Sequence, residues 1–230
     1  MIGVSLSFDA DKGFYIPFLE WHPDKNSKKM KSINKRKLEV FSEGNFRCVW
    51  SGKEYQEFVT PKEYTPPELF TNIFTDWFLD SKAQLLMHNA PFDVLMLGSN
   101  LGINLESKIF CDTRLLKHVL DENTSSSLKD TAILWQVLLG LDVKEEANKE
   151  QIEMGKSVEL NGGVYNKRTK HVWRASPDIL GKYACSDAFL TYGLFNVGIK
   201  KLQSEYEKKH FDWFFEDEVM PLCREVVIPR

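Results

Sequence analysis

The stretch from Gln84 to Leu97 contains a carboxylate in a position suited to chemistry. An apolar run ends at His88-Asn89, a turn containing Pro91 follows, and Phe92-Asp93 opens a second apolar run with helical spacing. This pattern predicts a buried strand over 84–88, a tight turn and the start of a helix. Open α/β sheets bind their ligands at the ends of such strands. Asp93 is therefore a candidate binding or catalytic residue, and capping of the helix is the alternative interpretation.

A second candidate carboxylate lies far along the chain, in the stretch from Tyr183 to Phe195. Tyr183 and Asp187 are four residues apart in a sequence whose apolar residues have helical spacing. Residues at i and i+4 share one face of a helix, so the hydroxyl and the carboxylate are expected to point the same way. The alternative is an amphipathic helix whose tyrosine and aspartate face water.

Together these motifs resemble the proofreading 3′–5′ exonuclease domain of family A (DNA polymerase I-like) DNA polymerases. Residues 89–93, Asn-Ala-Pro-Phe-Asp, are similar to the second motif of the DEDD exonucleases, and Tyr183-x-x-x-Asp187 is similar to their third motif in its tyrosine (DEDDy) form. Cys111-Asp112-Thr113 and residues 127–132 lie between them in the order expected for the family. The resemblance implies a ribonuclease H-like α/β fold, in which a mixed sheet is flanked by helices. The alternation of predicted strands and helices independently favours an α/β domain.

The residue types fit the chemistry that the resemblance implies. Hydrolysis of a phosphodiester requires neutralisation of its oxygens, a hydroxide near neutral pH and help for the leaving 3′ oxygen, and two divalent cations supply all three. Mg²⁺ and Mn²⁺ prefer carboxylate and water ligands. By the resemblance, Asp93 and Asp187 are catalytic metal ligands, and Tyr183 orients the attacking water. The implied substrate-binding residues are Asn89 near the scissile end, Phe92, which would fix Asp93 by packing, and His88 beside the cleft, for which a packed or capping role is the alternative.

The first motif of the family, Asp-x-Glu, has no counterpart in this sequence. In the family, that motif precedes a strand similar to residues 2–8, with which the sequence opens. The nearest acidic pair, Asp9 and Asp11, falls in a predicted hairpin turn. We therefore expect the N-terminal strand of the fold to be missing. Two carboxylates hold one hydrated cation weakly, so we expect weak or no exonuclease activity from this chain taken alone.

The predicted organisation is an exonuclease-like domain over residues 1–213, followed over 214–230 by the start of a linker toward an absent polymerase domain. Residues 24–62 are predicted to be a basic and β-rich insertion, whose lysines form a solvated loop or an arm that grips phosphates. The expected partners are a single-stranded DNA 3′ end and a polymerase domain or separate polymerase subunit. The alternatives are a catalytically inactive module that binds DNA or supports a polymerase, and a stand-alone exoribonuclease similar to RNase D.

Periodicity and capping residues predict the other elements. Helices are expected from residue 65 onward, from 93 to about 97 with breaks at Gly98 and Gly102, over 113–120, over 128–139, over 178–197 and over 200–213, and a strand over 108–111.

The composition of the chain limits the classes of protein to which it can belong. Hydrophobic residues make up 43% of the 230 residues, enough for a sizeable core, and the net charge of −3 does not by itself indicate a nucleic-acid-binding protein. The four cysteines form no Cys-x-x-Cys pair, which favours free thiols in a reducing compartment. The sequence has no signal peptide and no apolar run long enough to span a membrane. We therefore expect no membrane partner and a cytoplasmic location, in a bacterial or phage-infected cell.

Overall fold

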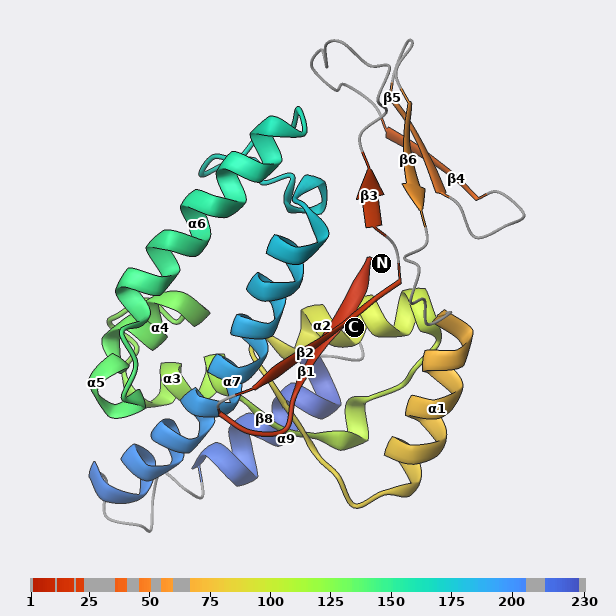
Figure 1. Cartoon of the computed structure of the whole chain (residues 1–230). Coiled ribbons are helices and arrows are strands. Elements are labelled where there is room, and N and C mark those ends of the chain that lie inside the picture. The colour runs from red at the N-terminus through yellow and green to blue at the C-terminus, as the bar shows by residue number, and fades with distance from the viewer. Residues whose placement is uncertain are drawn as a thin grey trace. The chain divides into compact units, whose positions relative to one another are not determined.

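The computed structural model of the chain (Figure 1) divides into two compact units. The first comprises residues 1–5, 14–65 and 147–185, and the second comprises residues 6–13, 66–146 and 186–230. The division falls within two long helices, α6 (Val143–Leu160) and α7 (Pro177–Glu205). The structure describes residues 2–10, 12–18, 20–22, 36–40, 46–50, 55–59, 67–205 and 214–227.

The strands of the chain's N-terminal part form two small sheets. β1 pairs with β2, as the predicted hairpin requires, and β3, β6, β5 and β4 form an antiparallel sheet in that order. β4 to β6 confirm the β-rich character expected after residue 37. Asp11 and most of the basic run before β4 lie outside the described residues. The bounds are β1 Gly3–Ser7, β2 Gly13–Pro17, β3 Glu20–His22, β4 Arg36–Val40, β5 Phe46–Trp50 and β6 Tyr55–Val59.

Helix α6 was not among the helices predicted from the sequence, and it provides much of the core of the first unit. Met154 and Val158 are completely buried, and they cluster with Ala175 beneath the partly buried residues of α7. The turn after α6 is tight, because a Cβ on Gly163 would lie 2.5 Å from Cγ1 of Val158. Buried Arg174 secures this turn, and its Nη1 donates to the Gly162 carbonyl at 2.6 Å.

The second unit contains the parallel strand pair β7 and β8 with several helices. β7 and β8 pair in parallel with a register shift after their first residue pair, and α9 lies against β8 (Figure 1). The predicted strands and helices are confirmed here, including α3 with the expected bounds, except that the one helix expected over 128–139 is divided at Trp135 into α4 and α5. The bounds are α1 Pro67–Asp80, β7 Leu85–Met87, α2 Ala90–Leu101, β8 Ile109–Asp112, α3 Thr113–Leu120, α4 Leu128–Leu134, α5 Gln136–Leu139 and α9 Met220–Leu222.

Other helix boundaries also differ from expectation. α2 begins at Ala90, whereas the sequence placed its start at residue 93. α2 continues through Gly98 and ends only before Gly102, whose φ of 68° and N–H bond to the Gly98 carbonyl form a left-handed cap. α7 is one helix where two were expected, and it passes through Gly198. A Cβ on Gly198 would lie 2.6 Å from Cδ2 of Leu116. Glycine is therefore present inside α7 because α3 packs too closely for a side chain, and it does not end the helix.

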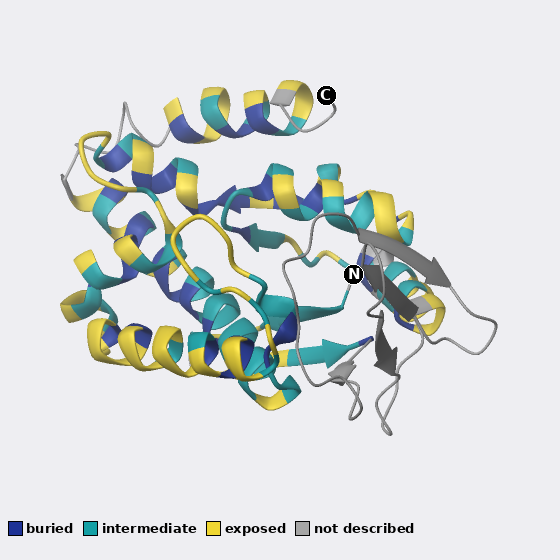
Figure 2. Ribbon diagram, turned by 90° about the horizontal axis from the view of Figure 1, so that it is seen from above, coloured by how far each residue is buried: buried dark blue, intermediate teal, exposed yellow. Residues whose placement is uncertain are grey.

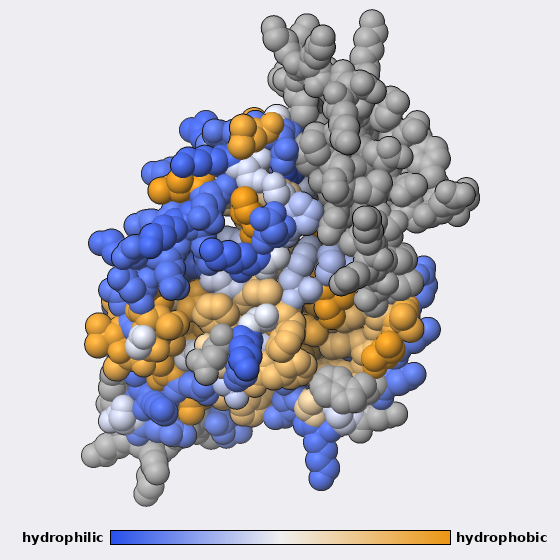
Figure 3. All heavy atoms as spheres, viewed as in Figure 1, coloured by the Kyte–Doolittle hydropathy of each residue, from blue (hydrophilic) through white to orange (hydrophobic). Residues whose placement is uncertain are grey.

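The helices are amphipathic, with buried and exposed residues on different faces (Figure 2). Some apolar side chains are nevertheless exposed around α5, where apolar surface is visible in Figure 3. Among the cysteines whose side chains are described, Cys111, Cys185 and Cys223 are free thiols. No helix in the described part of the chain combines the length and apolar character needed to cross a membrane.

Candidate active site

The turn between β7 and α2 has an unusual backbone conformation. Asn89 adopts φ 73° and ψ 55°, and it is the one non-glycine residue with positive φ within the described part of the chain. Asparagine tolerates this left-handed region better than most residues. The conformation allows the chain to leave strand β7 and enter α2 at once, with Pro91 in the first turn. Asp93 thereby follows the strand end within one helical turn.

Asp112, at the end of the neighbouring strand β8, fixes this turn. Its side chain accepts backbone N–H bonds from Asn89 at 3.0 Å and from Ala90 at 2.8 Å. It also caps α3 by accepting the Arg114 N–H at 2.9 Å. Asp112 is 1% exposed, so these three donors replace water around a buried carboxylate. Asp112 lies in a stretch that resembles the family, but this role was not predicted from the sequence. Its position just before a predicted helix was the available signal.

Asp93 lies inside the first turn of α2, after the capping position, so the capping interpretation of this residue is wrong. Its carboxyl group is largely buried. Burial, together with the negative charge of Asp112, raises the pKa of Asp93 from 3.8 to about 6. A carboxylate whose ionised form is this unfavourable is stabilised by any cation that binds next to it.

His88 is held by the neighbouring strand and helix. Thr113 Oγ1 donates to the Met87 carbonyl at 3.1 Å and lies 2.9 Å from Nδ1 of His88. Because that hydroxyl proton is already used, Nδ1 of His88 is the donor in the second bond. Burial lowers the pKa of His88, although the Asp112 charge and a backbone hydrogen bond at Ser126 act in the opposite direction. His88 is thus a neutral, packed residue beside the turn.

The side chains of Asn89 and Phe92 have different surroundings. Oδ1 of Asn89 accepts a bond from Nη1 of Arg114 at 2.9 Å. Phe92 is 57% exposed, so more than half of its ring is available to a ligand. The packing of Phe92 against Asp93 expected from the sequence stays a prediction.

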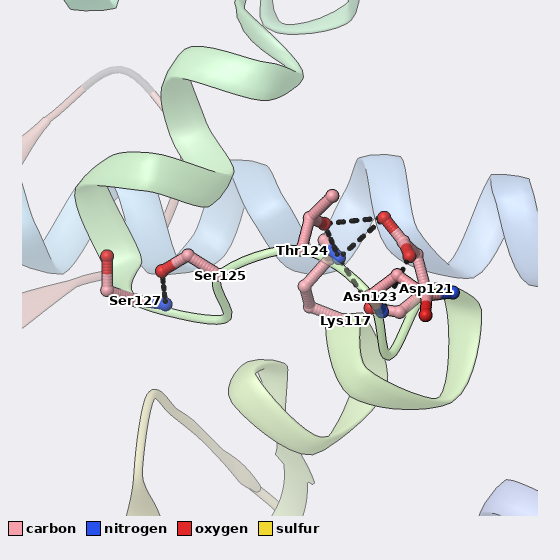
Figure 4. Close-up of polar contacts among 6 residues, drawn as sticks. All are labelled: Lys117, Asp121, Asn123, Thr124, Ser125 and Ser127. Carbon is pink, nitrogen blue, oxygen red and sulfur yellow. Dashed lines mark hydrogen bonds and ion pairs between the residues drawn. The ribbon is translucent and has the colours of Figure 1, made fainter.

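A polar loop between α3 and α4 determines where α4 begins. Nζ of Lys117, which is completely buried, donates to the Asp121 carbonyl at 2.7 Å and to Oγ1 of Thr124 at 2.6 Å (Figure 4). Ser127 then caps α4 by accepting the Asp130 N–H. The loop is thus fixed at both ends, and Lys129 comes in the first turn of α4.

Lys129 contacts the second candidate carboxylate. Its Nζ lies 3.0 Å from Oδ1 of Asp187 on α7 and donates to Oγ of Ser186 at 3.1 Å. The side chains of Lys129 and Asp187 are 17% and 30% exposed, so solvent screens the ion pair only partly. The sequence did not predict this contact, since nothing in the local pattern of either residue points to the other.

Tyr183 lies one helical turn before Asp187 on α7, within the first unit. It is partly buried and packs against the cluster of Met154, Val158 and Ala175. The i, i+4 spacing along a single helix is therefore realised, as the sequence predicted.

The carboxylates meet only part of what a metal site requires. Among the described residues, no group of three or more histidine, cysteine, aspartate or glutamate side chains is placed to hold a metal ion. The raised pKa of Asp93 fits a residue that gains from a nearby cation. Asp187 already contacts the ammonium group of Lys129. The assignment of Asp93 and Asp187 as metal ligands therefore stays a prediction, and a site for two cations would need further ligands.

A comparison with known families identifies the family of the chain. The profile of a 3′–5′ exonuclease family, the exonuclease domain of the DNA polymerase A type, matches residues 40–205. The match covers more than half of the chain and includes the turn at Asn89 as well as Tyr183 and Asp187. The chain belongs to this family and contains a 3′–5′ exonuclease module with a mixed α/β fold. No curated protein matches the chain.

The raised pKa of Asp93 predicts a pH-dependent cost to stability. The folded state holds the Asp93 proton up to about pH 6, whereas the unfolded state releases it near 3.8. The contribution of Asp93 to stability therefore falls as pH rises from about 4 to about 6. The free energy of unfolding of Asp93→Asn should equal that of the parent protein at pH 4 and exceed it by roughly 1–3 kcal/mol at pH 8. Urea unfolding at both pH values measures this difference, and Asp76→Asn, at an exposed position of α1, is the control. An equal gain at both pH values would contradict the assigned cause.

The ion pair of Lys129 with Asp187 predicts competition with divalent cations. Lys129→Met removes the positive charge and keeps most of the side-chain length. Mn²⁺ affinity should rise roughly tenfold, because the repulsion of about 1–2 kcal/mol between the ammonium group and a cation at Asp187 is removed. The affinity is measured by Mn²⁺ titration in electron paramagnetic resonance. Lys182→Met, on the exposed surface of α7, is the control, and Asp187→Asn should remove the gain. Unchanged affinity in Lys129→Met would show that cations bind elsewhere.

Proposed function

We propose that this chain is the proofreading 3′–5′ exonuclease domain of a family A DNA polymerase. It would remove nucleotides from single-stranded DNA 3′ ends by two-metal hydrolysis. Family membership supports the reaction class. The observation that carries the proposal for the site is Asp93, a largely buried carboxylate with a raised pKa in the family's second motif. Such a group favours a bound cation, as this chemistry requires.

Each side chain has a proposed task in this reaction. Asp93 and Asp187 would hold Mg²⁺ or Mn²⁺, and the bound cations would supply charge neutralisation and an activated water. Tyr183 would orient that water through its hydroxyl group. The exposed ring of Phe92 offers a surface on which a terminal base stacks. Asn89 would contact the substrate near the scissile end.

The proposed organisation places the exonuclease domain in residues 1–213 and the start of a linker toward a polymerase domain or subunit in residues 214–230. The helical character of residues 214–227 is compatible with such a linker. Residues 24–62 would be an insertion.

An end-resolved nuclease assay tests the function. The 230-residue chain and a version with an Asp-x-Glu strand added before it are given 5′-labelled single-stranded DNA or RNA with Mn²⁺. We expect stepwise shortening from the 3′ end, faster on DNA, by the extended version. The 230 residues alone should be slower by about a thousandfold or more. Internal cleavage or digestion from the 5′ end would refute the proposal, and faster RNA trimming would favour an exoribonuclease similar to RNase D.

A catalytically inactive DNA-binding or polymerase-supporting module is the second candidate, because Lys129 occupies one side of Asp187. An ammonium group can neutralise this carboxylate without a metal. If the extended version binds DNA but neither cleaves it nor binds Mn²⁺ tightly, the second candidate is correct.

A further inference from the structure

The guanidinium group of Arg114 lies at the turn that carries the candidate site. Its Nη1 donates to Oδ1 of Asn89 at 2.9 Å, and its Nε donates to Oγ of Ser126 at 3.4 Å. Arg114 is an exposed residue. Within the described part of the chain, no carboxylate lies in ion-pair range of Arg114, and the nearby Asp112 already accepts three backbone N–H bonds. The positive charge therefore has no direct counter-ion in the residues that the structure describes.

The contact with Arg114 also sets the orientation of the Asn89 amide. A guanidinium group donates five N–H bonds and accepts none, so the amide oxygen must face Arg114. The amide nitrogen of Asn89, Nδ2, must then point away, with two N–H donors. No described residue accepts from Nδ2, and three of the five guanidinium N–H groups are likewise unused among the described residues. The backbone of Asn89 is held by its N–H bond to Asp112 at 3.0 Å, and its amide is held by the bond from Arg114 at 2.9 Å.

We propose that Arg114 and Asn89 together bind a backbone phosphate of the nucleic-acid strand beside the candidate site. The proposal rests on the proposed nuclease function and adds a binding residue, Arg114, that the motifs do not contain. The donors and the charge select an anion with several oxygen acceptors, and a phosphate fits this requirement. A negative charge close to this place is the Asp112 carboxylate, which accepts the backbone N–H bonds of Asn89 and Arg114. Arg114 thus offsets the repulsion that a phosphate meets there.

The contact is sequence-blind, because every nucleotide carries the same phosphate. Arg114 contributes charge, and it is also a positioning residue for Asn89. These two roles predict different results for conservative and non-conservative substitutions. Lysine keeps the charge but lacks the planar fork, whereas methionine lacks both.

Binding measured without metal separates these roles from catalysis. Fluorescence anisotropy of a 5′-fluorescein single-stranded oligo(dT) is recorded with the 230-residue chain in EDTA over a series of salt concentrations. We expect Arg114→Met to weaken binding about 5–30-fold at low salt and to reduce the salt slope by about 0.7, the value for one single-strand phosphate. Arg114→Lys should keep the slope with intermediate affinity. Asn89→Asp, which keeps an oxygen toward Arg114 but replaces the donors by an acceptor, should weaken binding at least as much as Arg114→Met.

The control is Arg168→Met, which removes an exposed arginine in a loop of the first unit. Its affinity for the oligonucleotide should stay within about twofold of that of the parent protein. If the parent binds and Arg114→Met or Asn89→Asp binds equally well, the phosphate contact is wrong and the nuclease function stands. Weaker binding with an unchanged salt slope would assign Arg114 a structural role only and would also overturn the proposal. If the parent does not bind the oligo(dT), both the contact and the proposed function fail.

Discussion

Replacing Asp112 with alanine should lower the free energy of unfolding by about 3–5 kcal/mol. The carboxylate accepts N–H bonds from Asn89, Ala90 and Arg114, and the residue is 1% exposed. Alanine leaves these donors without their acceptor and removes the cap of α3. Each lost bond to a charged group costs about 1.5–3 kcal/mol, and hydration of the freed N–H groups offsets part of this cost. The left-handed conformation of Asn89 also loses its main support. Urea unfolding followed by circular dichroism measures the change.

A milder substitution keeps this prediction testable if Asp112→Ala does not fold. Asp112→Asn retains one acceptor oxygen but points an amide group at a backbone donor, so a loss of about 2 kcal/mol is expected. It also removes the charge that helps to raise the pKa of Asp93, which should therefore fall toward its ordinary value. Asp76→Ala, at an exposed position of α1, should change stability by less than about 0.5 kcal/mol. Near-parental stability in Asp112→Asn and Asp112→Ala would mean that the three bonds do not hold the turn.

Asp93→Ala should reduce cleavage by about a thousandfold or more in the version that carries an added Asp-x-Glu strand. Loss of a metal-holding carboxylate removes several kcal/mol of transition-state stabilisation. The free energy of unfolding of Asp93→Ala should instead rise, because the ionised form of Asp93 destabilises the folded state above about pH 6. Lower activity in a protein that is at least as stable separates a functional residue from a structural one. Single-turnover cleavage of 5′-labelled DNA and urea unfolding at pH 8 measure the two quantities.

Asp187→Ala should cause a comparable loss of cleavage. Its effect on stability is expected to be small, because the ion pair with Lys129 is partly exposed. Asp76→Ala is again the matched control and should keep parental activity. Parental activity in either Asp93→Ala or Asp187→Ala would remove that residue from the proposed site, whereas loss of folding would make it a structural residue.

The sequence by itself determined the α/β class, the family and most elements around the candidate site. β7, α3 and the start of α7 follow from apolar periodicity and from proline, serine and aspartate at element ends. These signals are local, since each depends on residues within a few positions of one another. Local signals failed where tertiary packing decided, as at Gly198 inside α7. Glycine is needed there because Leu116 leaves no room for a side chain, and it does not end the helix.

Only the tertiary structure decided how the candidate residues are held and charged. Asp112 supports Asn89, Arg114 orients its amide, and Lys129 pairs with Asp187, although each pair is distant in sequence. Neither partner of such a contact carries a periodic or capping signal that names the other. The raised pKa of Asp93 has the same origin, because burial and the Asp112 charge exist only once β7 and β8 lie side by side.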